Sequence, residues 1–208
     1  QACANLQIYD PYYCQGGTKR RLGKLGFDHV HNENEDFYVV AKSENVTAFD
    51  VLVTNPPFSD AEHVTFALDF AISSGKPWLM ILPVSFIFSD IFTRVEQVLG
   101  ADGLRPFYVV PGKKYNFKTP APLPPPPKID RHHQARTRSR ISHTLWVVQG
   151  GADKELHQRL LEVARSSFDE EGVEWAESVS ELPKSALPGH FTKDMKRVAE
   201  LQGLVLSD

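Results

Sequence analysis

The chain has 208 residues, 41% of them hydrophobic and 24% charged, which is the composition of a globular protein and excludes collagen, a coiled coil and a wholly disordered chain. This length allows one domain with room for a small appendage. The formal net charge of −3 excludes a uniformly basic surface, so any contact with nucleic acid has to come from a local patch. No apolar run approaches the roughly 18 residues of a membrane span, and we expect no membrane association.

Cysteine usage indicates the compartment. Cys3 and Cys14 are the two cysteines, and no Cys/His cluster has the spacing of zinc ligands. We therefore expect no metal site and a reducing, intracellular setting, without distinguishing nucleus, cytoplasm and mitochondrion. Because the chain opens on Gln1 and reaches a strand-like run at once, we interpret it as a fragment or processed product of a longer protein.

The first half of the chain alternates predicted strands and helices. In chain order we expect a strand at 6–9, a helix at 19–25 closed by Gly26, a short strand at 27–31, a polar turn at 32–36, extended chain at 37–40 and a strand at 49–54. The last run is the strongest strand, and its near-continuous apolar character favours a central parallel strand covered on both faces. Only about 11 residues separate Tyr38 from Asp50, too few for a full helix and strand, so the middle of the fold is abbreviated.

The second half continues the alternation. We expect a helix at 61–73, a strand at 76–83, a helix at 90–99, strands at 107–110 and 144–148, and helices at 153–166 and 192–201. The pattern predicts an α/β fold with a mostly parallel, doubly wound sheet. Residues 1–150 form the predicted domain, with 118–141 as a Pro/Arg-rich inserted loop. Residues 151–208 form a C-terminal helical extension that packs on the sheet or on a protein partner. In such sheets ligands bind outside the carboxyl ends of the strands. The turns at 10–17 and 55–58 follow two of these ends, so we expect them to lie together.

The tetrapeptide Asn55-Pro56-Pro57-Phe58 directly follows the strand at 49–54. An exocyclic amine of adenine is a poor nucleophile because its lone pair is delocalised into the ring. The Asn55 side-chain oxygen and the Pro56 carbonyl can accept its N–H bonds and favour a localised lone pair, and the two prolines stiffen the loop. Phe58 offers an aromatic face to a flipped base. The alternative interpretation is a turn that only ends a strand.

This tetrapeptide resembles the (Asn/Asp)-Pro-Pro-(Tyr/Phe) motif of class I S-adenosylmethionine-dependent methyltransferases that act on planar amino nitrogens. The resemblance covers roughly residues 5–150. It implies a Rossmann-like sheet, S-adenosylmethionine as cofactor, no metal, and methyl transfer to an exocyclic amino group of a nucleobase, with adenine N6 in RNA or DNA favoured. Alternatives are guanine N2 of ribosomal RNA, a protein glutamine (although those enzymes generally have Tyr at the fourth position) and a catalytically idle scaffold in a ribonucleoprotein.

The turn at 10–17 resembles the Asp-Pro-x-Cys-Gly-x-Gly cofactor loop of the same superfamily, with one extra residue before the cysteine. Glycines in such a loop let the backbone approach a ligand and begin the next helix. A glycine pair that merely starts a helix is the alternative. The resemblance implies that the cofactor contacts Asp10, Pro11, Tyr12, Cys14, Gly16 and Gly17.

Acidic residues follow the second predicted strand. The superfamily places an acid there to bind the ribose hydroxyls, and we expect this to be Glu33, with the competitors Asn32, Asn34 and Glu35. Asp36 and Phe37 resemble the Asp-Phe pair with which some of these enzymes hold the adenine, through a carboxylate on the exocyclic amine and a ring against the base. The alternative is a solvated acidic turn.

The segment at 118–140 is strongly basic in an acidic chain. It holds one acid, Asp130, against six basic residues: Lys118, Lys128, Arg131, Arg136, Arg138 and Arg140. Prolines crowd 122–127 and favour a stiff polyproline II stretch. We expect this arm to contact phosphates of nucleic acid, with RNA favoured over DNA. A disordered loop or a partner-docking segment is the alternative.

Overall fold

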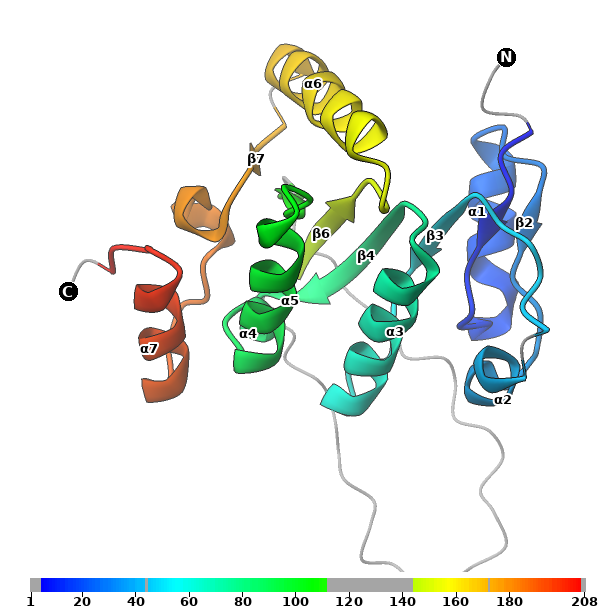
Figure 1. Cartoon of the computed structure of the whole chain (residues 1–208), viewed down its shortest axis with the longest axis horizontal. Helices are drawn as coiled ribbons and strands as arrows, with labels where there is room; N and C mark the ends of the chain where they lie inside the picture. The colour runs from blue at the N-terminus through cyan, green and yellow to red at the C-terminus, as the bar shows by residue number, and fades with distance from the viewer. Residues whose placement is uncertain (1–4, 44, 112–143, 172, 207–208) are drawn as a thin grey trace, which may run out of the picture.

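A seven-stranded sheet in the order β2-β1-β3-β4-β6-β5-β7 organises the protein (Figure 1). The computed structural model describes residues 5–43, 45–111, 144–171 and 173–206. The strands are β1 Ile8–Tyr9, β2 Val30–His31, β3 Val51–Thr54, β4 Trp78–Pro83, β5 Phe107–Val109, β6 Thr144–Gln149 and β7 Trp175–Ala176.

Strands β1 to β5 all run in one direction. β1 pairs in parallel with β2 and β3, and β3 pairs in parallel with β4. β6 is antiparallel to both β4 and β5, so β5 keeps the direction of β4, and β7 is antiparallel to β5. The expected mostly parallel α/β sheet is confirmed, with its two reversed strands at one side, and the arrangement is compatible with a Rossmann-like fold.

Side-chain caps set the starts of several helices. Asp60 accepts from the Glu62 N–H before α3, Ser89 from the Phe92 N–H before α5, and Thr192 caps the last helix in the same way. The predicted helices at 61–73, 90–99 and 192–201 are confirmed to within two residues. The helices are α1 Gly17–Lys24, α2 Phe37–Lys42, α3 Ala61–Ser74, α4 Val84–Ile87, α5 Asp90–Ala101, α6 Lys154–Glu171 and α7 Lys193–Leu201, and the 3-10 turns are η1 Cys14–Gly16, η2 Val179–Glu181 and η3 Lys184–Ala186.

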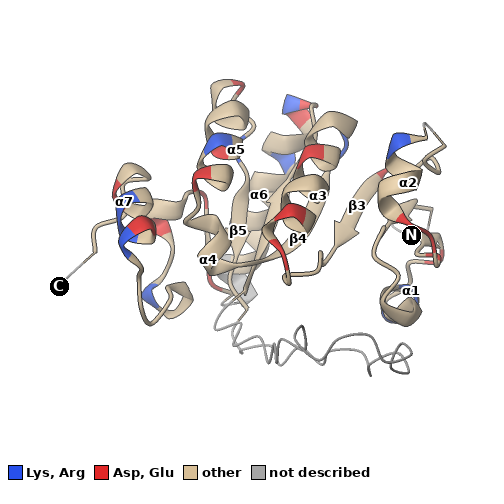
Figure 2. Ribbon diagram, turned by 90° about the horizontal axis from the view of Figure 1, so that it is seen from below, with Lys and Arg blue, Asp and Glu red and all other residues tan. Residues whose placement is uncertain are grey.

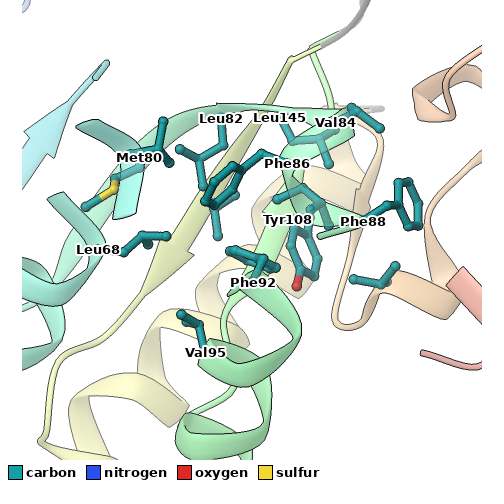
Figure 3. Packing of buried hydrophobic residues seen from close by; sticks show 14 of the residues in the cluster. Leu68, Met80, Leu82, Val84, Phe86, Phe88, Phe92, Val95, Tyr108 and Leu145 are labelled. Carbon is teal, nitrogen blue, oxygen red and sulfur yellow. The ribbon is translucent and has the colours of Figure 1, made fainter. Parts of the chain in front are cut away.

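Alternate residues of β5 face two different layers, because successive strand residues point to opposite sides of a sheet. Tyr108 lies in the main core with Phe92 of α5 and Leu145 of β6 (Figure 3). Phe107 and Val109 instead form a second cluster against α6. The sheet is therefore covered on one face by α3, α4 and α5 and on the other, at β5 and β6, by α6.

The coverage of β3 differs from the prediction. Leu52 and Thr54 are 0% and 4% exposed beneath α3, whereas Val51 and Val53 on the opposite face are only half-buried. Both faces of β3 and β4 are uncharged, and Figure 2 shows charge on the helices instead. The expectation of a strand fully covered on both faces is thus wrong for its second face.

Residues 37–40 form the first turns of α2, so the expectation of extended chain is wrong there. The run Phe-Tyr-Val-Val has strand propensity, but the Asp36 carboxylate accepts hydrogen bonds from the Tyr38 and Val39 N–H groups and caps a helix. Phe37 then anchors the short helix in the core with 4% exposure. The abbreviated middle is confirmed, since the described residues between β2 and β3 contain this six-residue helix and no strand.

Residues after 150 belong to the same core as the rest of the chain. Besides two helices they contain β7, which extends the sheet beside β5, so the expected helical extension also supplies a strand. Val179, Val198 and Ala199 are at most 1% exposed within the main core. None of the helices in the described part of the chain is long and apolar enough to cross a bilayer.

Candidate functional site

The carboxyl ends of β2, β1 and β3 lie side by side. Tyr9 at the end of β1 is level with His31 of β2 and Leu52 of β3, so the polar residues that follow each strand meet at one edge. The Thr54 hydroxyl donates a 2.7 Å hydrogen bond to the Asp10 carboxylate. This contact joins the first residue of the turn at 10–17 to the last residue of β3, directly before the turn at 55–58, so the two turns begin beside each other as the sequence predicts.

Asp10 is a buried carboxylate at the centre of this edge, with 3% exposure. It accepts hydrogen bonds from Thr54 and, at 3.3 Å, from the Tyr12 N–H, and the Thr18 side chain is a further partner. Burial raises the pKa of Asp10, and the hydrogen bonds oppose that rise because they stabilise the charged form. The carboxylate therefore ties β1, β3 and the start of α1 together.

Asn32 joins β2 to the same turn. Its Nδ2 donates to the backbone oxygens of Asp10 and Tyr12 at 3.1 and 3.2 Å. The side chain is 1% exposed, and its Oδ1 is buried with no hydrogen-bond partner in the part of the chain that the structure describes. A buried acceptor without a partner is costly, so it marks a place where a ligand or water would donate a hydrogen bond.

Asn55 carries a second acceptor of this kind. Its Oδ1 is buried and, among the described residues, has no hydrogen-bond partner. Pro56 next to it is buried, Pro57 and Phe58 are half-buried, and Phe58 packs against the main core. Two prolines hold the loop, so the oxygen meets an incoming donor with little reorganisation.

The loop between β1 and α1 is left-handed over three residues in succession. Cys14, Gln15 and Gly16 have φ values of 39°, 62° and 66°. Such conformations cost a non-glycine residue about 1–3 kcal/mol, and they cluster where a backbone must take a particular shape at a ligand. Glycine at 16 avoids this cost, and Gly17 begins α1. Cys14 is exposed as a residue, but partial desolvation of its thiol and the nearby Asp10 charge raise its pKa, which opposes a nucleophilic role.

The acidic turn after β2 is engaged in local contacts. Glu33 forms a 2.7 Å ion pair with Lys19 of α1, and this lysine lowers the pKa of Glu33. Asp36 caps α2. Phe37 lies inside the core, edge-on to the rings of Phe66 and Phe70. Each of the three residues expected to bind the ribose and adenine thus has a structural partner, and their cofactor roles stay predictions.

The sequence singled out Tyr12, but not its neighbours Tyr38 and His63. The Tyr12 hydroxyl donates to the backbone oxygen of His63 at 3.1 Å, and the Tyr38 hydroxyl contacts the His63 Nδ1. Thr54, the donor to Asp10, was also missed. The signal for Thr54 was a polar residue at the end of an otherwise apolar strand, whereas nothing in the sequence pairs His63 with either tyrosine.

The predicted phosphate-binding arm at 118–140 lies outside the described residues. Within the described ranges, no group of three or more His, Cys, Asp or Glu side chains could hold a metal ion.

The described chain is an α/β protein with a polar edge built from the ends of three parallel strands. Comparison of the sequence with protein-family models and with curated proteins finds no match.

Proposed function

We propose that the protein transfers a methyl group from S-adenosylmethionine to an exocyclic amino group of a nucleobase, with adenine N6 in RNA or DNA favoured. The observation that carries this proposal is the buried Asn55 Oδ1 just after β3, which has no hydrogen-bond partner within the described part of the chain. It lies in the Asn-Pro-Pro-Phe tetrapeptide that resembles the motif of amino-methyltransferases. An amine N–H would satisfy this acceptor.

The residues present fit the cofactor at two points. The Asn32 Oδ1 is a second buried acceptor without a partner in the described chain, one strand away from Asp10, and suits a hydroxyl or amine donor of the cofactor. The left-handed loop at Cys14–Gly16 suits close approach of its backbone to the cofactor's amino-acid part. Bound S-adenosylmethionine supplies an electrophilic methyl carbon whose leaving group is a neutral thioether.

The chain's own residues would then prepare the amine. The Asn55 Oδ1 and the Pro56 carbonyl would accept hydrogen bonds from its two N–H groups. These bonds favour a lone pair that is localised on the nitrogen and less delocalised into the ring. The Phe58 ring supports the base. With the cofactor bound, this amine would receive the methyl group as the carbon–sulfur bond breaks, and the methylated amine would release one proton to solvent.

Replacing Asn55 tests this mechanism. Asn55→Ala should reduce labelled methyl transfer on the order of 10²–10³-fold, because one preorganised acceptor is lost. Its affinity for S-adenosylmethionine, measured by calorimetry, should stay nearly unchanged. Asn45→Ala, at an exposed position after α2, is the matched control. Full methyl-transfer activity of Asn55→Ala would refute this mechanism.

RNA, DNA and protein fractions are offered to the labelled cofactor, and the products are hydrolysed and identified. N6-methyladenosine or its deoxy form supports the proposal. N2-methylguanosine or N-methylglutamine identifies one of the alternative targets instead.

A catalytically idle scaffold is the second candidate. It is favoured by the local engagement of Glu33 with Lys19 and of Phe37 with the core, which occupies two side chains expected to hold the cofactor. If the chain does not bind S-adenosylmethionine at high micromolar concentration, the scaffold is supported and the proposed methyl transfer is refuted.

A further inference from the structure

Helix α1 differs in charge from the other helices that the structure describes. It carries four basic residues and no acid, and the sequence from 11 to 27 contains no acid at all. The other described helices with more than one basic residue, α6 and α7, also carry acids. In a chain with a net charge of −3 this helix is a local basic patch, which is the feature that binding of a polyanion requires.

Three of the four cations share the outward face of α1. At 3.6 residues per turn, Arg20, Arg21 and Lys24 fall within about a third of the helix circumference. All three are exposed, whereas Leu22 on the opposite side is half-buried. The fourth cation, Lys19, forms the ion pair with the acidic turn and is not part of this face. No residue of α1 is fully buried, so the helix lies on the surface beside β2 (Figure 1).

The charge of this face is not neutralised within the described chain. Arg21 and Lys24 form no hydrogen bond or ion pair with the described residues. Arg20 donates one guanidinium hydrogen bond to the Gln15 backbone oxygen, at 3.0 Å, and keeps its other N–H groups for a partner. Like charges three and four positions apart destabilise a helix. The face therefore lowers the stability of α1, and a bound polyanion would relieve the repulsion.

An exposed tyrosine lies at the start of the same surface. A Cβ added at Gly16 would be 3.4 Å from the Tyr13 ring and 3.8 Å from the Arg20 Nη1, so the ring and the guanidinium flank this glycine. A Cβ at Gly17 would be 3.3 Å from the Arg21 Nη1. Both arginines thus reach back to the loop between β1 and α1. Guanidinium groups that pair with phosphates, next to a ring that stacks on a base, are typical of surfaces that bind a nucleic-acid strand.

We propose that the outward face of α1, formed by Arg20, Arg21 and Lys24, binds phosphates of a single nucleic-acid strand, with a base stacked on Tyr13. This inference rests on the proposed function, because it takes a nucleobase as the methyl acceptor, and it names a surface that holds the rest of the strand. The face follows directly on the loop whose first residue, Asp10, is bonded to the end of β3. Phosphate contacts do not depend on sequence, so this face supplies affinity and not the choice of base.

Fluorescence anisotropy of the whole chain with a labelled single strand of about 20 nucleotides, as RNA and as DNA, tests this face without S-adenosylmethionine. The association constant should fall with salt, with a slope on logarithmic axes of about −0.7 for each phosphate contact. Arg21→Gln/Lys24→Gln should weaken binding on the order of tenfold at low salt and make the slope shallower by about 1.4. Lys193→Gln/Lys196→Gln makes the same charge change on exposed residues of α7, at the other end of the molecule (Figure 1), and should bind as the wild-type chain does.

The α1 double variant should keep its fold, because both side chains are exposed and repel each other. Its Tm should therefore not fall, and weaker binding then reports the lost charges. Tyr13→Ala should weaken binding at least fivefold without changing the salt slope, because the ring carries no charge. Unchanged affinity of this variant would refute the stacking.

The proposal is overturned if neither strand binds, or if the α1 double variant binds as the α7 control does. It is also overturned if phosphatidylserine vesicles or polyglutamate, at equal charge concentration, displace the strand as well as unlabelled RNA does, since the face would then fit a membrane or an acidic protein. A chain that binds the strand but transfers no methyl group refutes the proposed function and not this inference, because the binding assay contains no cofactor.

Discussion

Thr54→Val would test how the candidate site is held together. Valine keeps the shape and strand preference of threonine but removes the hydroxyl that donates 2.7 Å to the Asp10 carboxylate. Both side chains are buried, with 4% and 3% exposure, so water cannot replace the lost donor. A hydrogen bond to a charged group contributes about 1.5–3 kcal/mol, and we expect the free energy of unfolding to fall by about 2 kcal/mol. For a chain of this size the Tm should drop by about 4–8 °C.

The dependence of this loss on pH identifies its cause. Burial raises the folded-state pKa of Asp10 above its ordinary value of 3.8, so the folded chain binds this proton more readily than the unfolded chain does. The folded state is therefore less stable with Asp10 charged than with Asp10 protonated. As the pH falls through the raised pKa, the carboxyl becomes neutral and needs the threonine donor less. The deficit of Thr54→Val should therefore shrink from neutral to mildly acidic pH.

Urea unfolding at both pH values measures this deficit. Thr65→Val is the control, because the half-buried Thr65 hydroxyl donates to the Ala61 backbone oxygen within α3 and so tests the same change at a neutral acceptor. A deficit that is the same at both pH values, or no larger than that of the control, would refute the assigned role of the Thr54–Asp10 bond.

Three further substitutions test a helix cap and two glycines. Asp36→Ala removes the side chain that caps α2 and should lower the free energy of unfolding by about 1 kcal/mol, measured by urea unfolding, with an unchanged value arguing against the cap. Gly151→Ala places a Cβ 2.6 Å from the Gly75 backbone oxygen at a φ of +77°, so the chain should lose several degrees of Tm or fail to fold. Gly23→Ala, inside α1 with open space around it, should instead stabilise by about 0.5–1 kcal/mol, and thermal unfolding of the two alanine variants should move in opposite directions.

Local patterns were enough to find most strands and every helix except α2 and α4. The spacing of Val64, Leu68 and Ala71 predicted α3, because one face of a helix must be apolar to pack on a sheet. The same reasoning failed at Phe37, where β-branched neighbours suggested extended chain. The capping bond of Asp36 and the burial of Phe37 outweighed that propensity, and burial depends on residues of α3 that are distant in the sequence.

The position of the candidate site could also be predicted, since parallel strands carry their following turns to one edge and both turns were visible as polar breaks. The sequence could not show which polar atoms at this edge remain without a hydrogen-bond partner. Glu33 is paired with Lys19 of the neighbouring helix, whereas Asn32 and Asn55 carry buried acceptors that have no partner among the described residues.

The alternation of apolar strands and amphipathic helices was therefore sufficient to predict an α/β sheet and the edge where its polar turns meet. Hydrophobic periodicity depends only on residues that are close in the sequence. The direction of β6, the place of β7 in the sheet and the Thr54–Asp10 bond depended on pairings between distant residues. Those pairings follow from how whole elements pack, since a buried polar group finds its partner only after the surrounding core has closed.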